Sequence, residues 1–242
     1  FCQSLTMTDL SALRDKYRQE KQTLWSHIAK STANGRGLKP TLGRLAKLAD
    51  KLLVQLWRNA GFEHGEALIA VGGYGRGELF PSSDVDVLVL LPDSVIAEES
   101  PDLKAKLEAF IGSCWDSGLE IGSSVRNLKD CIDESEKDIT VKTSLLESRL
   151  LAGSLSLYQQ FQQSYQEAMD PHAFFVAKTL ELNQRHNKFE NTPYSLEPNC
   201  KESPGGLRDL QIILWISRAA GLGHTWDDLA AKGLATALEV KQ

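Results

Sequence analysis

Apolar residues recur at helical spacing along the first part of the chain. In 8–30 and again in 40–59 they stand three or four positions apart, with charged residues between them. This spacing gathers apolar side chains on one face of a helix. The pattern predicts two long helices joined by a loop at 31–40, which contains the segment Asn-Gly-Arg-Gly. We interpret residues 1–62 as a helical lead-in.

Further along the chain the apolar residues form short unbroken runs instead. The runs 68–71 and 87–91 are apolar at every position, which is typical of strands covered on both faces, so the second is predicted to be a central strand. A helix is expected at about 102–117 and a third strand at 120–126. The order strand, turn, strand, helix, strand predicts a mixed sheet with helices on one side. We assign this sheet to a domain spanning 63–152.

Helical spacing returns after this sheet, and no further strand is predicted. A Pro- and Gly-rich segment at 191–206 is expected to be an extended loop. The chain is therefore predicted to be α+β, with an all-helical C-terminal domain at 153–242. Helices after the third strand are expected at 128–135, 139–151, 155–169, 171–189 and 207–220.

Two aspartates, Asp84 and Asp86, stand at the start of the second predicted strand. Side chains at i and i+2 of a strand project from the same face, so both carboxylates can grip the same ions. Without a cation between them, the two like charges repel. Carboxylate oxygens suit magnesium, which takes one or two carboxylates together with water and substrate phosphates. The pair therefore indicates a site for a magnesium-bound triphosphate.

A glycine pair, Gly72-Gly73, follows the first predicted strand. Because glycine has no Cβ, the backbone there can approach a phosphate and present N–H groups to it. Arg76 would add a positive charge nearby, and Ser83 is a candidate helper. The segment 75–79 can form one helical turn whose N-terminus faces the anion.

Other phosphate-binding motifs do not fit the sequence. No G-x-x-x-x-G-K-[ST] occurs, and Glu78 stands where G-x-G-x-x-G needs its last glycine. A glycine pair alone is often a plain turn, and D-x-D alone often arises by chance. Here each half lies on its own apolar strand, with ten residues between the two halves. The combination resembles the signature of the polymerase-beta-like nucleotidyltransferase superfamily.

That superfamily implies a third carboxylate on a later strand. Glu120 is the best candidate, because it opens the third predicted strand between apolar neighbours. It would act either as a catalytic base or as a ligand to a catalytic metal ion. Asp116 is the second candidate, although it lies where the preceding helix should end. The alternative for Glu120 is a surface glutamate on an edge strand.

Charge and composition limit the classes of substrate and the cellular compartment that we expect for this protein. The 242 residues carry a net charge of −5, and no basic run is interleaved with aromatic residues as on a nucleic-acid-binding face. A polynucleotide substrate is therefore disfavoured. Four scattered cysteines form no C-x-x-C pair, so neither zinc nor a disulfide framework is indicated. No apolar run reaches about eighteen residues and no signal peptide is evident, so we expect a cytoplasmic protein without a membrane partner.

Five segments, in this order, resemble the bacterial PII uridylyltransferase/uridylyl-removing enzyme family: VGGYGRGELFPSSDVDVLVLL, LEIGSSVRNLKDC, TSLLESRLLAG, NQRH and LEPNCKESPGGLRDLQ. The first is shared with distant relatives such as the glutamine synthetase adenylyltransferases, whereas the K-x-S-P-G-G-L-R-D block is more particular. The resemblance covers about residues 53–220. It implies transfer of a uridylyl group from UTP to a tyrosine hydroxyl of the PII signalling protein, with release of pyrophosphate. For this transfer we expect two magnesium ions, held by Asp84, Asp86 and the triphosphate.

The resemblance also reaches individual residues. Gly72 and Gly73 match the phosphate turn, Asp84 and Asp86 match the metal ligands, and Glu120 falls where the third carboxylate is expected. Further family positions are matched by residues to which we assign nucleotide-binding roles: Arg76, Ser83, Arg126, Lys201 and Arg208.

Lys201 and Arg208 flank the start of the last predicted helix, where positive groups and a helix N-terminus can face an anion. From physics alone, a solvated connector at 191–206 is the favoured alternative. The resemblance is what makes this loop a candidate part of the site.

The family further implies an HD-type phosphohydrolase domain that removes the uridylyl group, and ACT domains that sense glutamine. No His-Asp dipeptide occurs in this sequence, and Phe1 stands in place of an initiator methionine. We therefore expect a piece of a longer protein, truncated within its helical domain. Two rival functions remain: an adenylyltransferase that uses ATP, and a module that senses a nucleotide without turning it over.

Overall fold

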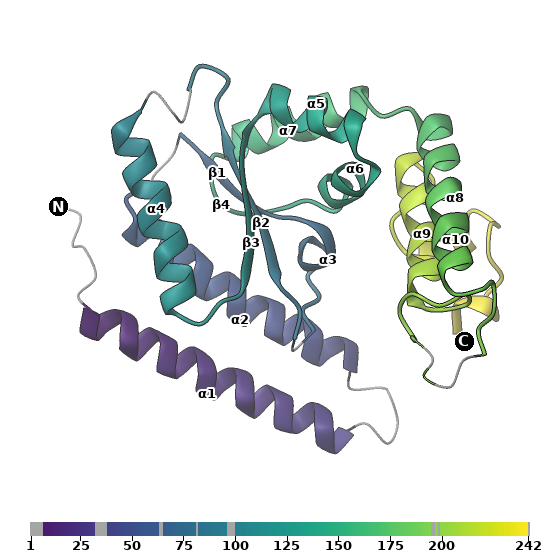
Figure 1. Ribbon diagram of the computed structural model, residues 1–242, viewed down its shortest axis with the longest axis horizontal. Helices are drawn as coiled ribbons and strands as arrows, with labels where there is room; N and C mark the ends of the chain where they lie inside the picture. Colours follow the sequence, from purple (N-terminus) through teal and green to yellow (C-terminus); the bar gives the residue numbers. More distant parts are fainter. Residues whose placement is uncertain are drawn as a thin grey trace.

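A mixed β-sheet forms the centre of the described part of the chain (Figure 1). The computed structural model describes residues 7–31, 38–62, 65–80, 82–95, 100–194, 197 and 199–241. The sheet has the order β3-β2-β1-β4, with β1 antiparallel to both β2 and β4, and β2 parallel to β3. The predicted α+β class with a mixed sheet is confirmed. The strands are β1 (Ala67–Ala70), β2 (Val85–Leu91), β3 (Ile121–Asn127) and β4 (Arg149–Gly153).

Strand β2 is central, as its unbroken apolar run predicts. It lies between β1 and β3, and its residues from Val87 to Leu91 are all buried. The register places Val87 opposite Ala70 of β1 and Asp86 beside Gly122 of β3. Asp86, the first polar residue of β2, therefore lies at the end of the strands where β1 finishes and β3 begins.

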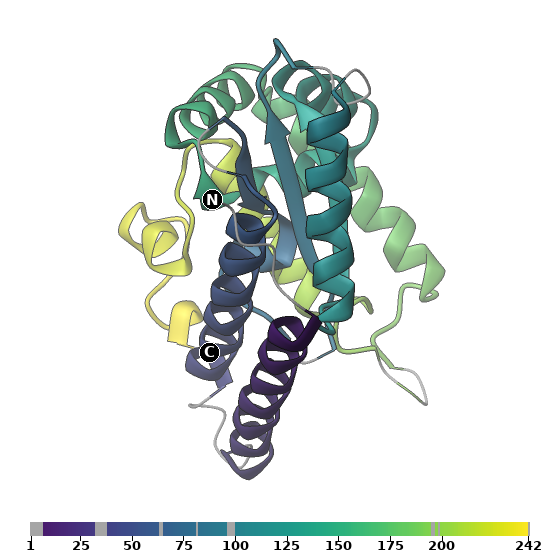
Figure 2. The same cartoon turned by 90° about the vertical axis from the view of Figure 1, so that its left-hand side faces the viewer.

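One face of the sheet is covered by α2 (Leu38–Asn59) and α4 (Pro101–Asp116), with α1 (Met7–Ser31) packed outside them (Figure 2). Most apolar residues of α2 recur at helical spacing and are buried, as the sequence predicts, whereas Leu48 is only partly buried. Trp57 at the end of α2 stacks on Phe62 with ring centroids 3.8 Å apart, and both rings meet Phe110 of α4 edge-on. These aromatic contacts anchor the helical lead-in to the sheet.

Helices also cover the opposite face, where α5 (Leu128–Lys137), α6 (Ile139–Leu146) and α7 (Leu155–Glu167) lie. The expectation of helices on one side is therefore wrong. Leu88 and Leu90 of β2 point into this second layer with Phe161 of α7, while Val87 and Val89 point into the first. Alternate residues of a strand point to opposite faces of the sheet, and here the residues on both faces are apolar. Both faces therefore need to be covered, because a face left in water would expose large apolar side chains.

The predicted helix at 139–151 is wrong in its second half. Helix α6 ends at Leu146, and Arg149–Gly153 forms β4 along the free edge of β1. Leu150 packs into one layer and Leu151 into the other, which is the alternation of a strand. Pairing with β1 satisfies backbone groups that an open edge would leave to water, so tertiary pairing overrides the local helical pattern. The expectation that strands cease after β3 is wrong for the same reason.

The predicted helical turn at 75–79 is also displaced. The observed turn, α3 (Gly72–Gly75), begins at the glycine pair itself. Gly72 has a φ of 58°, a backbone conformation that favours glycine, and it turns the chain out of β1 directly into the helix. The glycine pair is therefore part of the helical turn.

The C-terminal part of the described chain is helical, as predicted. Its main helices, α8 (Pro171–Lys188) and α9 (Leu207–Ala219), pack around Phe174, Ile212 and Trp215. Two short elements that the sequence pattern did not predict follow, α10 (Trp226–Ala231) and the 3₁₀ helix η2 (Glu239–Lys241). Among the described residues, no helix is both long enough and apolar enough to cross a membrane.

Candidate functional site

A cavity of about 830 Å³ lies between the sheet domain and the C-terminal helices. One wall comes from α3, the start of β2 and α6, and the other from α8, α9 and the loop before α9. This volume lies within the range of small-molecule sites. The cavity brings together most of the residues predicted from the sequence: Gly72, Gly73, Arg76, Ser83, Asp84, Asp86, Lys201 and Arg208.

The two aspartates lie side by side on the first wall. Asp86 is half-buried and Asp84 is exposed, and neither forms an ion pair among the described residues. Burial raises the pKa of the Asp86 carboxyl above its ordinary value, and the negative charge of Asp84 raises it further. A Cβ on Gly122 of β3 would lie 2.5 Å from Asp86 Oδ1, so this glycine leaves the space that the carboxylate occupies. Asp86 is thus half-buried beside a like charge, with no ion-pair partner among the described residues.

The glycine turn lies against the same carboxylate. A Cβ on Gly72 would lie 3.5 Å from Asp86 Oδ2 and 3.3 Å from the Ser144 hydroxyl oxygen of α6. Backbone, hydroxyl and carboxylate therefore converge at one corner of the cavity. Sequence reasoning did not find Ser144, because the pattern at 139–151 shows only a helix and does not say which face meets α3.

Arg76 lines the cavity but is already paired. Its Nη1 atom lies 2.5 Å from Glu147 Oε2, and its Nε atom lies 3.8 Å from Glu78 Oε2. Glu147 is 4% exposed and follows directly after α6. The sequence did not indicate Glu147, since the predicted helix ran through it. Arg76 therefore contributes its charge to the cavity only in part.

The opposite wall holds a buried lysine that sequence reasoning missed. Lys178 of α8 is 1% exposed, and its Nζ atom donates to Glu181 Oε2 at 2.6 Å. The same ammonium lies 4.6 Å from the ring centroid of Trp215, and the Arg208 guanidinium lies 5.2 Å from that centroid. Burial lowers the pKa of Lys178, while the Glu181 carboxylate acts against this. The available signal was that Lys178 follows Phe174 by four positions on the buried face of its helix.

The loop before α9 is held by one acid, Asp209. Its carboxylate accepts from His186 Nε2 at 2.9 Å and from the Gly205 amide at 2.8 Å, and it also pairs with Arg185. Burial acts to raise the pKa of Asp209, but these hydrogen bonds outweigh it and hold the pKa below its ordinary value. The loop that could have been a solvated connector is therefore tied to α8 and presents Lys201 to the cavity.

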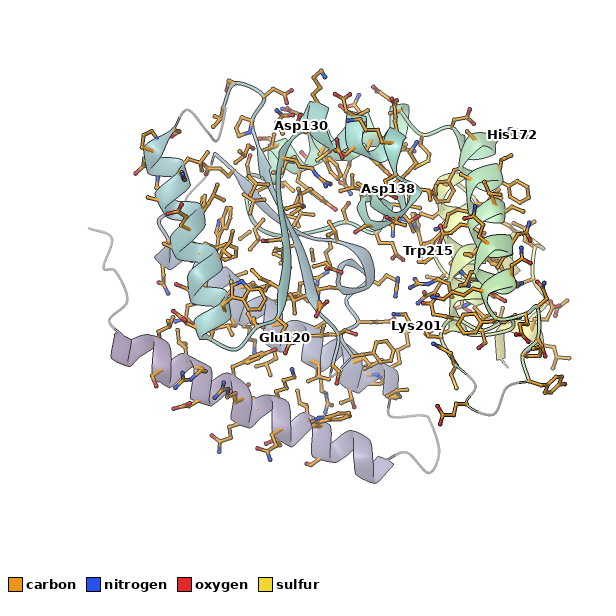
Figure 3. The ribbon with its side chains drawn as sticks, in the orientation of Figure 1. Glu120, Asp130, Asp138, His172, Lys201 and Trp215 are labelled. Atoms are coloured by element: carbon orange, nitrogen blue, oxygen red, sulfur yellow. The ribbon has the colours of Figure 1, made fainter. Side chains whose placement is uncertain are left out.

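Figure 3 shows Lys201 and Trp215 on the side of the C-terminal helices nearest to α3 and α6. Arg208 lies at the start of α9, where Nη1 donates to Gln211 at 2.9 Å and Nη2 to Glu202 at 3.2 Å. The positive groups of this wall thus have acidic or polar neighbours of their own.

Two predicted site residues do not line the cavity. Glu120 is exposed just before β3, where its carbonyl oxygen accepts from the Val85 amide at 2.8 Å (Figure 3). This register places it on the strand next to Asp84. Arg126 pairs with Leu90, six positions after Glu120 and toward α5. The second candidate acid, Asp116, is the exposed last residue of α4. Among the described residues, no group of three or more His, Cys, Asp or Glu side chains could hold a metal.

Known families match both walls of the cavity. The family model described as "Nucleotidyltransferase domain" matches residues 51–146, and the one described as "GlnD PII-uridylyltransferase" matches residues 173–242. These spans contain the aspartate wall and the Lys178 wall, respectively.

Curated relatives match nearly the whole chain. It is 52% identical over 230 residues to the bifunctional uridylyltransferase/uridylyl-removing enzyme of Cupriavidus pinatubonensis, covering 95% of this chain and 26% of the relative. The enzyme of the same name from Burkholderia lata is 58% identical over 198 residues, covering 82% of this chain and 23% of the relative. The chain thus spans about a quarter of the length of these relatives. It carries a nucleotidyltransferase domain and belongs to the family of bifunctional uridylyltransferase/uridylyl-removing enzymes.

Proposed function

We propose that this chain transfers a uridylyl group from magnesium-bound UTP to a tyrosine hydroxyl of the PII signalling protein. The observation that carries the proposal is the pairing of two unlike walls across one cavity. Asp84 and Asp86 line one wall, and Lys178, Lys201 and Arg208 line the other. A metal-bound triphosphate has complementary charges, because its cation suits the carboxylates and its phosphate oxygens suit the positive groups.

The donor set on the first wall fits magnesium. Two carboxylates at one corner are the number that magnesium takes from a protein when phosphates and water supply its other ligands. The raised pKa of Asp86 supports the same assignment, since a cation would relieve both its burial and its repulsion by Asp84. Asp84 and Asp86 would hold the metal, and a pair of magnesium ions would stabilise the negative charge that develops on the departing pyrophosphate.

The second wall would hold the phosphate oxygens. Lys178 has one of its three ammonium donors on Glu181, which leaves the others for a ligand in the cavity that it lines. Trp215 fixes Lys178 and Arg208 on its ring. The glycine pair and Ser144 face the same space from the sheet side and could approach the phosphates closely.

In the transfer itself, the tyrosine oxygen forms a bond to the α-phosphorus. The bond from that phosphorus to the oxygen shared with the β-phosphate breaks, and pyrophosphate leaves with the electron pair. The tyrosine proton passes to a base, for which Glu120 is our candidate because it lies just before β3 and its carbonyl oxygen accepts from the Val85 amide next to Asp84. Arg126 does not line the cavity, and its nucleotide-binding role stays a prediction.

The choice of UTP and PII rests on the relatives. These relatives are named bifunctional uridylyltransferase/uridylyl-removing enzymes, and a family model described as a PII-uridylyltransferase matches the wall that holds Lys178. Uridylyl removal and glutamine sensing are proposals for the longer protein, and we assign neither to the residues of this cavity.

The test is to incubate the 242-residue chain with PII, magnesium and either UTP or ATP, and to weigh the PII product by mass spectrometry. A uridylyl adduct on a tyrosine, formed with UTP and not with ATP, is the expected result. An adenylyl adduct would replace the proposal with an adenylyltransferase. Binding of UTP without any adduct would favour a module that senses the nucleotide.

A further inference from the structure

The glycine turn is too short to hold its own position. Helix α3 spans four residues, and an isolated helix of that length is unstable because nucleation costs more than one hydrogen bond returns. It also has almost no free space: a Cβ on Gly75 would lie 1.7 Å from the Glu147 carbonyl oxygen. Contacts from other elements must therefore set where Gly72 and Gly73 lie.

The main contacts come from a cluster of three residues on three separate elements, Asp50 of α2, Tyr74 of α3 and Arg149 of β4, here called the Asp50 cluster. The Arg149 guanidinium donates to Asp50 through Nη1 at 2.9 Å and Nη2 at 3.1 Å. The same side chain donates from Nε to the Gly75 carbonyl at 3.3 Å and from Nη2 to the Tyr74 carbonyl at 3.4 Å. One planar guanidinium thus binds a carboxylate and the carbonyls at the end of α3 together.

Tyr74 closes the cluster from the other side. Its hydroxyl donates to Asp50 Oδ1 at 2.5 Å, and its ring is 2% exposed and lies under the Arg149 guanidinium. Burial and the nearby Asp50 carboxylate raise the pKa of Tyr74 well above its ordinary value, so the hydroxyl stays a donor. Asp50 is therefore the acceptor on which both the side chain of α3 and its Arg149 cap depend.

The cluster connects the helical lead-in to the nucleotide wall. Asp50 lies on α2, which lines no part of the cavity among the described residues, whereas Tyr74 directly follows the glycine pair. Gly72 in turn lies against Asp86 and Ser144. A shift of α3 would therefore move the backbone that faces the phosphates relative to the carboxylates that hold the metal.

We propose that Asp50 is a positioning residue, which acts through Arg149 and Tyr74 to hold the Gly72-Gly73 turn at the distance from Asp86 that a metal-bound triphosphate needs. This rests on the proposed function for its ligand, but the position of the turn can be measured without any nucleotide. Neither Asp50 nor Arg149 lines the cavity. Their effect is on geometry, and misplacement by about 1 Å can cost on the order of 10²-fold in rate.

The test compares Asp50→Asn and Tyr74→Phe with Asp133→Asn, a control that removes an acid from an exposed ion pair with Lys129 on α5. Hydrogen exchange of the peptide covering 72–79 is measured first. We expect about tenfold faster exchange in Asp50→Asn, a smaller increase in Tyr74→Phe and none in the control, because a charged acceptor is lost in the first. Tyr74→Phe keeps the ring, so it serves if Asp50→Asn does not fold.

Binding of magnesium-UTP is then titrated for the same proteins. The expected result is a roughly tenfold weaker Kd for Asp50→Asn at full stoichiometry. A purely structural role would lower the stoichiometry or Tm at unchanged Kd, and would overturn the proposal. Unchanged exchange in both variants would also overturn it. If the wild-type chain binds no magnesium-UTP while Asp50→Asn still loosens the turn, the proposed function fails and the positioning role of Asp50 stands.

Discussion

The two walls of the cavity carry opposite charge and are built in opposite ways. The acidic wall uses Asp84 and Asp86, two positions apart at the start of one strand, and neither has a cationic partner among the described residues. The basic wall uses Lys178, Lys201 and Arg208, from two helices and a loop, and two of these already pair with acids. The acidic wall is therefore the one that a bound cation would stabilise. The basic wall can stand without a ligand.

Burial also has a different consequence for the charged side chain of each wall. Asp86 is buried against a like charge, and Lys178 is buried with Glu181 as its partner. A buried charge without a partner is costly, whereas a buried charge with a partner costs much less. A bound metal-triphosphate would thus relieve the acidic wall, while the basic wall would exchange protein acids for phosphate oxygens.

The largest expected effect concerns the acidic wall. Asp84→Asn or Asp86→Asn should each lower uridylyl transfer by about 10³-fold, because metal stabilisation worth several kcal/mol is lost. Tm without magnesium should not fall, since one of two repelling charges is gone. The measurement is the initial rate of PII modification together with thermal unfolding.

The matched control is Asp116→Asn, which removes an exposed acid at the end of α4 and should leave the rate unchanged. If Asp86→Asn keeps most of its activity, the acidic wall does not hold the catalytic metal. If Asp116→Asn instead lowers the rate, Asp116 would replace Glu120 as the candidate for the third carboxylate.

The next effect concerns the basic wall. Lys178→Met should weaken binding of magnesium-UTP by roughly 10- to 100-fold and leave UMP binding nearly unchanged, because the lost charged hydrogen bonds go to the outer phosphates. Calorimetric titration with both nucleotides measures the change in Kd for magnesium-UTP relative to the change in Kd for UMP. Stability should change little, because a buried charge is removed and the Glu181 carboxylate that loses its partner is 29% exposed and stays in contact with water.

Lys188→Met offers a comparison on the same helix, at an exposed position outside the cavity lining. It should bind both nucleotides as the wild type does. Equal weakening of UTP and UMP by Lys178→Met would place the lysine near the base or sugar and contradict its role at the phosphates.

The smallest expected effect is on stability and comes from Asp209. Its pKa lies below the ordinary value of 3.8, so its stabilising contribution is fully present above that value and is lost as the pH falls through the folded-state pKa. Asp209→Asn should lower the free energy of unfolding by about 1.5–3 kcal/mol at pH 7. The gap from the wild type should narrow as the pH falls below 3.8.

Urea unfolding at a series of pH values measures this gap, with Asp227→Asn as a control at an exposed position of α10. That variant should differ from the wild type by less than about 0.5 kcal/mol. A gap for Asp209→Asn that stays constant with pH would show that the stabilisation does not depend on its charge.

The strands that carry the acids were predictable because their signal is local. Unbroken apolar runs predict buried strands, and spacing by two places both carboxylates on one face. The segment Arg149–Gly153 lacked such a signal, since two leucines next to a helix fit either structure. This segment forms a strand because it pairs with the open edge of β1, and that edge exists only once the sheet has formed.

The positively charged side chains of the basic wall show the same limit of prediction from local sequence. A helix at 171–189 was predictable, and so was a buried stripe that includes Phe174. That Lys178 on this stripe meets Trp215, 37 positions away, follows only from the packing of α8 on α9. Sequence spacing cannot report such a contact, because helices of the same pattern can pack at several angles and registers.

By itself, the sequence determined the α+β class, the central strand and the corner where Asp84 and Asp86 meet, because these depend on periods of two and on unbroken apolar runs. Only the tertiary structure decided β4, the place of the glycine pair inside α3, the surroundings of the buried Lys178, and the Asp50 cluster. Each of these depends on which elements lie against one another. Backbone pairing and charge burial over long sequence distances have no local pattern that could predict them.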